Sequence, residues 1–159
     1  MKREVPNWDE YFMRMAQHVA VKSKDRSTQV GAVIVGEGHS ILSIGYNGFP
    51  RKTNDDIDSR HDRPMKYLWT EHAERNSIYS AARHGIKLAG STMYITGGGI
   101  ACADCARAII QAGVIEAIGN AGKFEGKGPW AESCLVGEVM LQEAGVKITL
   151  LSERYERIT

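Results

Sequence analysis

Hydrophobic and polar positions follow a helical period at the start of the chain and a strand-like period soon after it. Following Asn7, apolar residues recur three and four positions apart, which predicts one face of an amphipathic helix. These residues are Trp8, Tyr11, Phe12, Met15, Ala16 and Val19. Asn7 and Glu10 have the spacing of a capping box, which marks the start of the helix. Two β-rich runs follow, V-G-A-V-I-V (30–35) and I-L-S-I-G-Y (41–46), and the short G-E-G-H-S segment between them predicts an antiparallel hairpin.

The pattern breaks between Asn47 and Tyr67, where two prolines and many charged residues show neither period. A connection of this length inside a compact domain is usually functional or mobile, and we interpret it as a wall or a lid of a site. A helix is predicted next over 71–84, with Thr70 as the expected N-cap and Gly85 just past the end.

The rest of the chain alternates between strands and helices. The expected strands are 91–96, 114–119 and 146–151, and the expected helices are 102–112 and 131–144. Helices and strands that alternate in this way predict an α/β fold in which part of the sheet is parallel. We therefore expect a single domain over 1–159, built on one mixed sheet of about five strands flanked by helices.

The composition is that of a packed globular domain. The 159 residues are the usual size of one domain, and the apolar share of 43% is ordinary. No stretch approaches the roughly 18 apolar residues that a membrane-spanning helix needs. The start of the chain, M-K-R-E-V-P-N-W-D-E, does not contain the apolar core of a signal peptide. We expect a cytoplasmic protein that has no membrane partner.

The charge balance of the chain gives little support for binding to a nucleic-acid polymer. The net charge is +1, with acidic and basic residues interspersed, so little counterion release is available to drive general nucleic-acid binding. We therefore expect no polymeric nucleic acid as a partner. A single phosphate group is a different matter, because one or two basic side chains suffice to bind it.

The cysteines indicate metal or redox chemistry. There are three of them, Cys102, Cys105 and Cys134, and two are only three positions apart. An odd number with this spacing does not describe the disulfide framework of a secreted protein. We expect Cys134 to pack inside its helix as a small apolar residue.

The segment A-C-A-D-C (101–105) places the close pair after a predicted strand and at the start of a predicted helix. A helix N-terminus stabilises thiolate, which is the form that binds zinc. With His72, the two cysteines make three protein ligands and leave the fourth tetrahedral position to water, as catalytic zinc sites do. Water held there becomes acidic enough to act as hydroxide near neutral pH.

Glu74 lies two positions after His72 in E-H-A-E-R-N (71–76). Residues two apart on a regular helix point to different sides, so both can address one centre only if it lies beyond the helix end. There Glu74 can act first as a general base and then as a general acid without binding the metal. Activated water beside a proton-carrying carboxylate suits hydrolytic deamination of a nucleobase.

Three motifs give the chain a family resemblance. They are S-K-D-R-S-T-Q-V-G-A-V-I-V (23–35) with G-Y-N-G-F-P (45–50), H-A-E-R-N (72–76), and C-A-D-C-A-R-A-I-I-Q-A-G-V (102–114). The chain resembles the cytidine and deoxycytidylate deaminase superfamily, whose signature is H-x-E followed by P-C-x-x-C. The first motif is similar to that of deoxycytidylate deaminases, which convert dCMP to dUMP and ammonia.

The resemblance implies a cytidine-deaminase-like three-layer fold and a Zn²⁺ cofactor held by His72, Cys102 and Cys105, with Glu74 as the proton carrier. It further implies that Asn47 meets the sugar hydroxyl and that the backbone N–H of Ala73 meets the pyrimidine carbonyl oxygen. Similar enzymes are homo-oligomers, and several respond to a deoxynucleoside triphosphate effector.

Basic residues in the loops that flank the expected pocket are candidates for binding the 5′-phosphate of such a substrate, and Arg26 and Arg51 are the two we single out. His61, in the charged loop, is a candidate second metal or substrate contact. His18, His39 and His84 are expected to be structural or solvated. Trp130 and Phe124 are expected either to stack on a base or to pack in the core.

The chain departs from the family pattern at two places. Ala101 replaces the signature proline, which only favours a helix start, so the zinc site is expected to survive its loss. Residues 119–133 follow the family loosely, in a region that helps to build the pocket in relatives, and this leaves the substrate open. The same zinc chemistry on a free base, a purine or a modified nucleotide is therefore an alternative. A tRNA-editing deaminase is disfavoured by the balanced charge, and a non-catalytic zinc-binding module is disfavoured because it has no use for Glu74.

Overall fold

A five-stranded mixed sheet forms the centre of the computed structural model, which describes residues 3–120 and 130–152. The strands lie in the order β2-β1-β3-β4-β5. Their bounds are β1 Gly31–Val35, β2 Ile41–Tyr46, β3 Thr92–Ile95, β4 Glu116–Asn120 and β5 Lys147–Leu151. β1 pairs antiparallel with β2 and β3, while β3, β4 and β5 are parallel. The predicted hairpin and the predicted mixed sheet are both confirmed.

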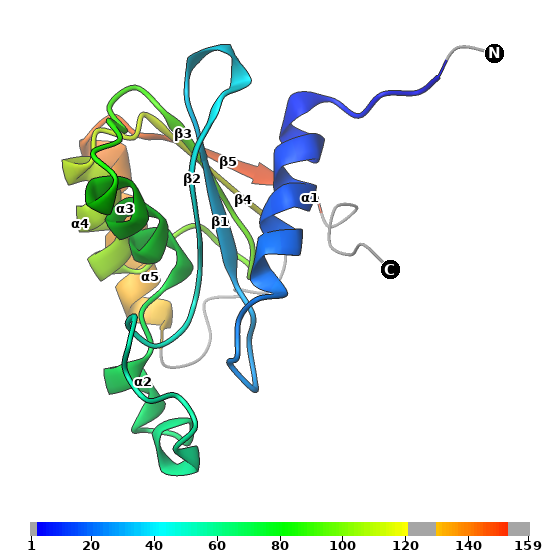
Figure 1. Cartoon of the computed structure of the whole chain (residues 1–159). Helices are drawn as coiled ribbons and strands as arrows, with labels where there is room; N and C mark the ends of the chain where they lie inside the picture. Colours follow the sequence, from blue (N-terminus) through cyan, green and yellow to red (C-terminus); the bar gives the residue numbers. More distant parts are fainter. Residues whose placement is uncertain (1–2, 121–129, 153–159) are drawn as a thin grey trace.

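Helices cover both faces of the sheet and give the three layers that the family resemblance implied (Figure 1). On one face lies α1 (Trp8–Ala20), and on the other lie α3 (Ala73–Arg83), α4 (Ala103–Gln111) and α5 (Ala131–Glu143). Short helices occur at η1 (Glu37–His39), η2 (Asp58–Arg60) and α2 (Lys66–Trp69). Among the helices of the described residues, none has both the length and the apolar character that crossing a bilayer requires.

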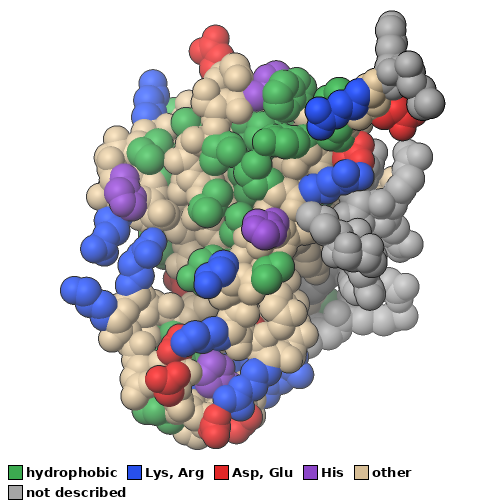
Figure 2. All heavy atoms as spheres, turned by 45° about the vertical axis from the view of Figure 1, so that its right-hand side comes forward, with side chains coloured by type: hydrophobic (Ala, Val, Ile, Leu, Met, Phe, Trp, Pro, Cys, Tyr) green, Lys and Arg blue, Asp and Glu red, His purple; other side chains and the backbone are tan. Residues whose placement is uncertain are grey.

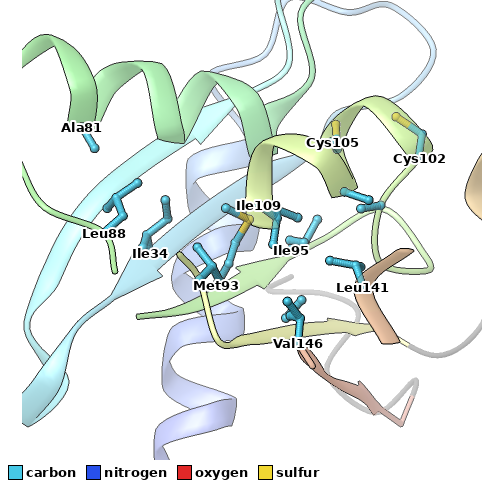
Figure 3. Packing of buried hydrophobic residues seen from close by; sticks show 14 residues of the cluster. Ile34, Ala81, Leu88, Met93, Ile95, Cys102, Cys105, Ile109, Leu141 and Val146 are labelled. Carbon is cyan, nitrogen blue, oxygen red and sulfur yellow. The ribbon is translucent and has the colours of Figure 1, made fainter. Parts of the chain in front are cut away.

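The two faces of the sheet bury alternate residues of the same strands. Val33 and Tyr94 pack with α1, while Ile34 and Met93 pack with the helices on the opposite face. This alternation follows from the period of two in an extended strand. Cys102 belongs to the same buried cluster as Ile34 and Met93, and Figure 3 shows it at one end of that cluster. The start of α4 is therefore continuous with the hydrophobic core.

Helix α1 begins where the sequence predicted, but the face that it buries is rotated relative to the predicted apolar face. The Asn7 side chain accepts a hydrogen bond from the Glu10 backbone N–H at 2.9 Å. The Glu10 carboxylate pairs with Arg14, so only the Asn7 half of the capping box forms. Trp8 and Tyr11 were expected on the buried face but are exposed, and the buried residues are Phe12, Met13, Ala16, Val19 and Ala20.

The expected start of α3 is wrong by two residues, and Thr70 is not its N-cap. Thr70 instead caps the end of α2, and His72 is the N-cap of α3. The reason is a bridge between backbones: Glu71 N–H donates to Gly48 O at 2.9 Å, and Gly48 N–H donates to Glu71 O at 3.0 Å. These bonds hold Glu71 extended, so the helix cannot begin before Ala73.

Two glycines allow the helices that carry the site to approach their neighbours closely. A side chain at Gly45 of β2 would place its first carbon 2.5 Å from Ala73 O, at the start of α3. A side chain at Gly137 of α5 would come 2.5 Å from Ala101 O, just before α4. Both contacts are far too short for a carbon atom, so only glycine permits this packing.

Candidate active site

The predicted metal ligands lie at the starts of two helices. His72 is the N-cap of α3, Cys102 is the N-cap of α4, and Cys105 lies in the first turn of α4. Neither cap residue uses its side chain to bond to its own helix. The imidazole and the thiols therefore face one another, and both cysteines are buried.

The distances within this group fit zinc. Nδ1 of His72 lies 3.6 Å from Sγ of Cys102 and 3.4 Å from Sγ of Cys105. A tetrahedral zinc ion with ordinary bond lengths places a ligand sulfur and a ligand nitrogen about 3.6 Å apart. Among the described residues, no fourth His, Cys, Asp or Glu joins the group. The three-ligand geometry is that of a catalytic zinc site rather than a closed structural one.

The three ligands influence one another's protonation. A hydrogen bond from Cys105 lowers the pKa of Cys102 to about 4. The same hydrogen bond, together with burial, raises the pKa of Cys105. The pKa of His72 is raised, chiefly by its hydrogen bond to Cys102. The lowered pKa favours the thiolate form of Cys102, and a divalent cation favours loss of the Cys105 proton as well.

Glu74 is buried beside these ligands without joining them. Its side chain belongs to the first turn of α3, and the residue is only 6% exposed. Burial raises the pKa of its carboxyl group, while the nearby His72 acts in the opposite direction. A carboxyl group with a raised pKa next to a metal site has the properties of a general acid and base.

His72, Cys102 and Glu74 line a cavity of about 590 Å³, and Cys105 lies behind this wall. This volume lies within the range that holds small-molecule ligands. The lining comes from residues within five parts of the chain: 25–30, Asn47, 63–74, 95–102 and 130–134. The long loop before α3, interpreted from the sequence as a wall of a site, contributes Asn47 and Arg63.

Asn47 and Ala73 both line the cavity, as their predicted roles require. The Asn47 side chain is almost fully buried, where it accepts from Val30 N–H at 2.8 Å and donates to Thr28 O at 2.9 Å. Ala73 is the first residue of α3, where a backbone N–H has no acceptor within the helix. Their contacts with a substrate stay predictions.

Arg26 and Arg51, the predicted phosphate ligands, lie outside the described lining of the cavity. The Arg26 guanidinium is held by an ion pair with Asp58, and both side chains are exposed. Arg51 is exposed on its loop. Arg63 and Lys66 are the basic residues of the lining. The sequence could not distinguish these four, because loop composition does not say which way a side chain points.

Comparison with known proteins agrees with this geometry. The family model described as the cytidine and deoxycytidylate deaminase zinc-binding region matches residues 6–120. The chain belongs to this family. The matched residues contain the three metal ligands, Glu74 and most of the cavity lining. Zinc is therefore the cofactor of this site, as its ligand set and spacing had indicated.

Relatives within the deaminase family extend over nearly the whole chain. An uncharacterized deaminase of the luxG 3′ region of Aliivibrio fischeri is 37% identical over 147 residues, which are 92% of this chain and 95% of the relative. Deoxycytidylate deaminase of Mus musculus is 35% identical over 156 residues, covering 95% of this chain and 83% of the relative.

A solved structure of a dCMP deaminase from the cyanophage S-TIM5, in complex with dCMP and dUMP, has a TM-score of 0.72 and 25% identity. It covers 94% of this chain and 100% of the phage chain. The expected cytidine-deaminase-like fold is confirmed.

The deaminase cavity also has a buried ion pair that the sequence did not indicate. Lys66 Nζ lies 2.8 Å from an Asp25 carboxylate oxygen, and the two side chains are 11% and 7% exposed. Burial alone would raise the pKa of Asp25, but hydrogen bonds from Lys66, Ser27 and Thr28 outweigh it and lower the pKa to about 2. The pair fixes the segment before β1 against α2, and both residues line the cavity.

Replacing Lys66 with methionine should lower the free energy of unfolding by about 3 kcal/mol at neutral pH, because the buried Asp25 carboxylate loses its counter-charge. The pKa of Asp25 is lower in the fold than its ordinary value of 3.8, so the pair stabilises above that pH and its contribution is lost as the pH falls through about 2. The difference in urea unfolding between wild type and variant should therefore narrow below pH 4.

The exposed pair between Lys24 and Asp55, also 2.8 Å apart, is the matched control. Lys24→Met should change stability little, because solvent screens an exposed pair. Equal unfolding midpoints for the Lys24 and Lys66 variants would show that the buried pair contributes no more to stability than the exposed pair.

The aromatic residues and the remaining cysteine and histidine candidates lie in different places relative to the cavity. The Trp130 ring contacts the His72 imidazole edge-on, with centroids 5.1 Å apart, and Tyr67 meets Trp130 in the same manner at 5.4 Å. Cys134 lines the cavity and does not belong to the metal-binding group. His61 stacks on Phe49 and lies outside the described lining. Phe124 and the rest of 121–129 lie outside the described residues.

Proposed function

We propose that this protein hydrolyses dCMP to dUMP and ammonia, using zinc. The observation that carries the proposal is a three-ligand His–Cys–Cys group, two members of which line the same cavity as the buried carboxyl group of Glu74. Family membership supports the reaction class. The name of the mouse relative and the ligands of the cyanophage structure support the substrate.

The protein's own residues divide the chemistry among them. Zinc held by His72, Cys102 and Cys105 would supply a Lewis acid that makes water nucleophilic near neutral pH. A carboxylate oxygen of Glu74 takes a proton from the water as its oxygen bonds to C4 of cytosine, and delivers that proton to ring N3. It then passes the remaining proton of the added oxygen to the amino group, whose bond to C4 breaks as ammonia leaves and the C4 carbonyl forms. Burial raises the pKa of Glu74, which helps the carboxyl group to hold a proton between these two steps.

Ala73 and Asn47 would orient the nucleotide. The N–H of Ala73 lies at the positive end of α3, which favours a bond to the pyrimidine carbonyl oxygen. Asn47 uses one donor and one lone pair on the neighbouring backbone. An amide side chain has two of each, so one donor and one lone pair remain for the sugar hydroxyl.

For the 5′-phosphate we propose Arg63. It lies in the cavity lining and can present two parallel N–H donors to a phosphate. Lys66 is a weaker candidate because Asp25 neutralises it. Arg26 and Arg51 stay as sequence predictions, to be compared with Arg63 in the same experiment.

Arg63→Ala should raise KM for dCMP by about tenfold or more and leave KM for deoxycytidine unchanged, because a charge-assisted bond to the phosphate is lost. Steady-state ammonia release with both substrates measures this. Arg26→Ala and Arg51→Ala should have smaller effects, since neither residue lines the described cavity. A rise in KM that is equal for dCMP and deoxycytidine would remove Arg63 from the phosphate site.

The proposed function is tested by a deamination screen. Zinc-replete protein should release ammonia from dCMP, while cytosine, cytidine, guanine and adenosine should react slowly or not at all. The alternative with the same chemistry predicts an inert dCMP and turnover of a free base, a purine or a modified nucleotide. A failure to convert any cytosine compound would remove the leading proposal.

A tRNA substrate has less support. On the face drawn in Figure 2, basic and acidic side chains are mixed, particularly toward the lower end. A track for RNA needs clustered positive charge. A gel shift with tRNA at physiological salt should accordingly show no complex, and a retained complex would favour RNA.

The proposal includes an assembly and a location. We propose a homo-oligomer in the cytoplasm, where a reducing environment keeps the cysteine ligands as thiols. A deoxynucleoside triphosphate is proposed as an effector. Light scattering tests the homo-oligomer, and the response of dCMP turnover to dCTP or dTTP tests the effector.

A further inference from the structure

A charged network outside the cavity joins the starts of the two metal-binding helices. Glu71, just before α3, accepts hydrogen bonds through Oε1 from the His72 backbone N–H at 2.9 Å and from Nε of Arg75 at 2.6 Å. Nη1 of Arg75 then lies 3.4 Å from a carboxylate oxygen of Asp104. Asp104 stands between the ligands Cys102 and Cys105 on α4.

The network crosses between the starts of α3 and α4, at the end of the two helices where the metal ligands lie. One end is the residue before the His72 ligand, and the other is inside the C-x-x-C turn. Arg75 is only 21% exposed, so its ion pairs are screened less than those of a fully solvated side chain. None of Glu71, Arg75 and Asp104 belongs to the described lining of the cavity.

The electrostatics of the site explain why such a link is needed. The starts of α3 and α4 each carry the positive end of a helix dipole, and the two ends face one another across the metal-binding group. Glu71 and Asp104 place negative charge at these two helix starts. Arg75 contacts both carboxylates and therefore links the start of α3 to the start of α4.

We propose that Arg75 is a positioning residue that holds the starts of α3 and α4 at the spacing zinc requires, acting through Glu71 and Asp104. The bond from His72 N–H to Glu71 fixes the backbone of the imidazole ligand, and the contact with Asp104 fixes the turn that carries both thiolates. Groups that orient metal ligands in this way typically change metal affinity 10- to 100-fold when removed. The inference rests on the metal centre of the proposed function and not on its substrate.

The test compares Arg75→Met with Arg107→Met. Arg107 pairs with the same carboxylate of Asp104, but it belongs to α4 itself and cannot connect the helices. Zinc affinity is measured by competition with a chromophoric chelator, and ligand geometry by the visible spectrum of the cobalt-substituted protein. Arg75→Met should weaken zinc binding about 10- to 100-fold and alter the cobalt spectrum, while Arg107→Met should match wild type.

Two further variants separate positioning from a general loss of stability. Arg75→Lys keeps the charge but loses the planar fork, so it should restore zinc affinity only in part. Asp104→Asn, at a residue whose side chain is 51% exposed, should weaken zinc binding, and combining it with Arg75→Met should add little. For Arg75→Met at saturating zinc, kcat for dCMP should fall by a larger factor than KM rises, because the residues that contact the substrate are intact.

The outcomes distinguish this inference from the proposed function. Zinc affinities of the Arg75 and Asp104 variants within twofold of wild type, with unchanged cobalt spectra, would overturn the positioning role and leave the deaminase proposal standing. Weakened zinc binding in a protein that does not convert dCMP would support the positioning role while the substrate proposal fails. A wild-type protein that binds no zinc would overturn both.

Discussion

Replacing Glu74 with glutamine is expected to lower kcat for dCMP by at least about a thousandfold while one zinc ion stays bound per chain. The amide has nearly the same shape, so the cavity and the three ligands should be undisturbed. It cannot take a proton from water or deliver one to a leaving amino group. Ammonia release gives the rate, and metal analysis of the same sample gives the zinc content.

The retention of zinc is what makes this variant decisive. Glu74 is not among the residues that can hold the ion, so a loss of metal would mean that its role is structural. Glu37→Gln, at an exposed residue of the hairpin turn, is the matched control and should keep full activity. Equal rates for Glu74→Gln and wild type would remove Glu74 from the mechanism.

The second large effect is expected from Cys105→Ala, which should reduce zinc to below about a tenth of an ion per chain and abolish turnover. Removing this thiolate leaves His72 and Cys102, and two ligands hold zinc poorly. The side chain is also completely buried between α4 and the core, so the loss should lower stability in addition. Metal analysis after dialysis against a weak chelator, together with thermal unfolding, measures both consequences.

Cys134→Ala is the natural control, because it removes a thiol from the wall of the same cavity. Cys134 does not belong to the metal-binding group, so this variant should keep one zinc ion per chain. Full zinc occupancy in both Cys102→Ala and Cys105→Ala would show that the ion, if bound, is held elsewhere.

Prediction from the sequence worked where neighbouring residues decide the structure. The hairpin over 30–46 and the alternation of helices and strands after Ala73 were both anticipated, since their periods depend on residues a few positions apart. The start of α3 was misplaced because the bridge between Glu71 and Gly48 is not local. On α1, Trp8 and Tyr11 have the right spacing for the core, yet the packing of the sheet selected Met13 instead.

The sequence by itself determined the chemistry of this protein. Residue types and short spacings, H-x-E and C-x-x-C, specify which atoms are available, and the matching family model agrees with them. The tertiary structure decided which distant groups meet: Nδ1 of His72 within 3.6 Å of both sulfurs, and Lys66 against an aspartate 41 positions earlier. Contacts of this kind depend on how helices and loops pack, and packing is a property of the whole fold rather than of any short segment.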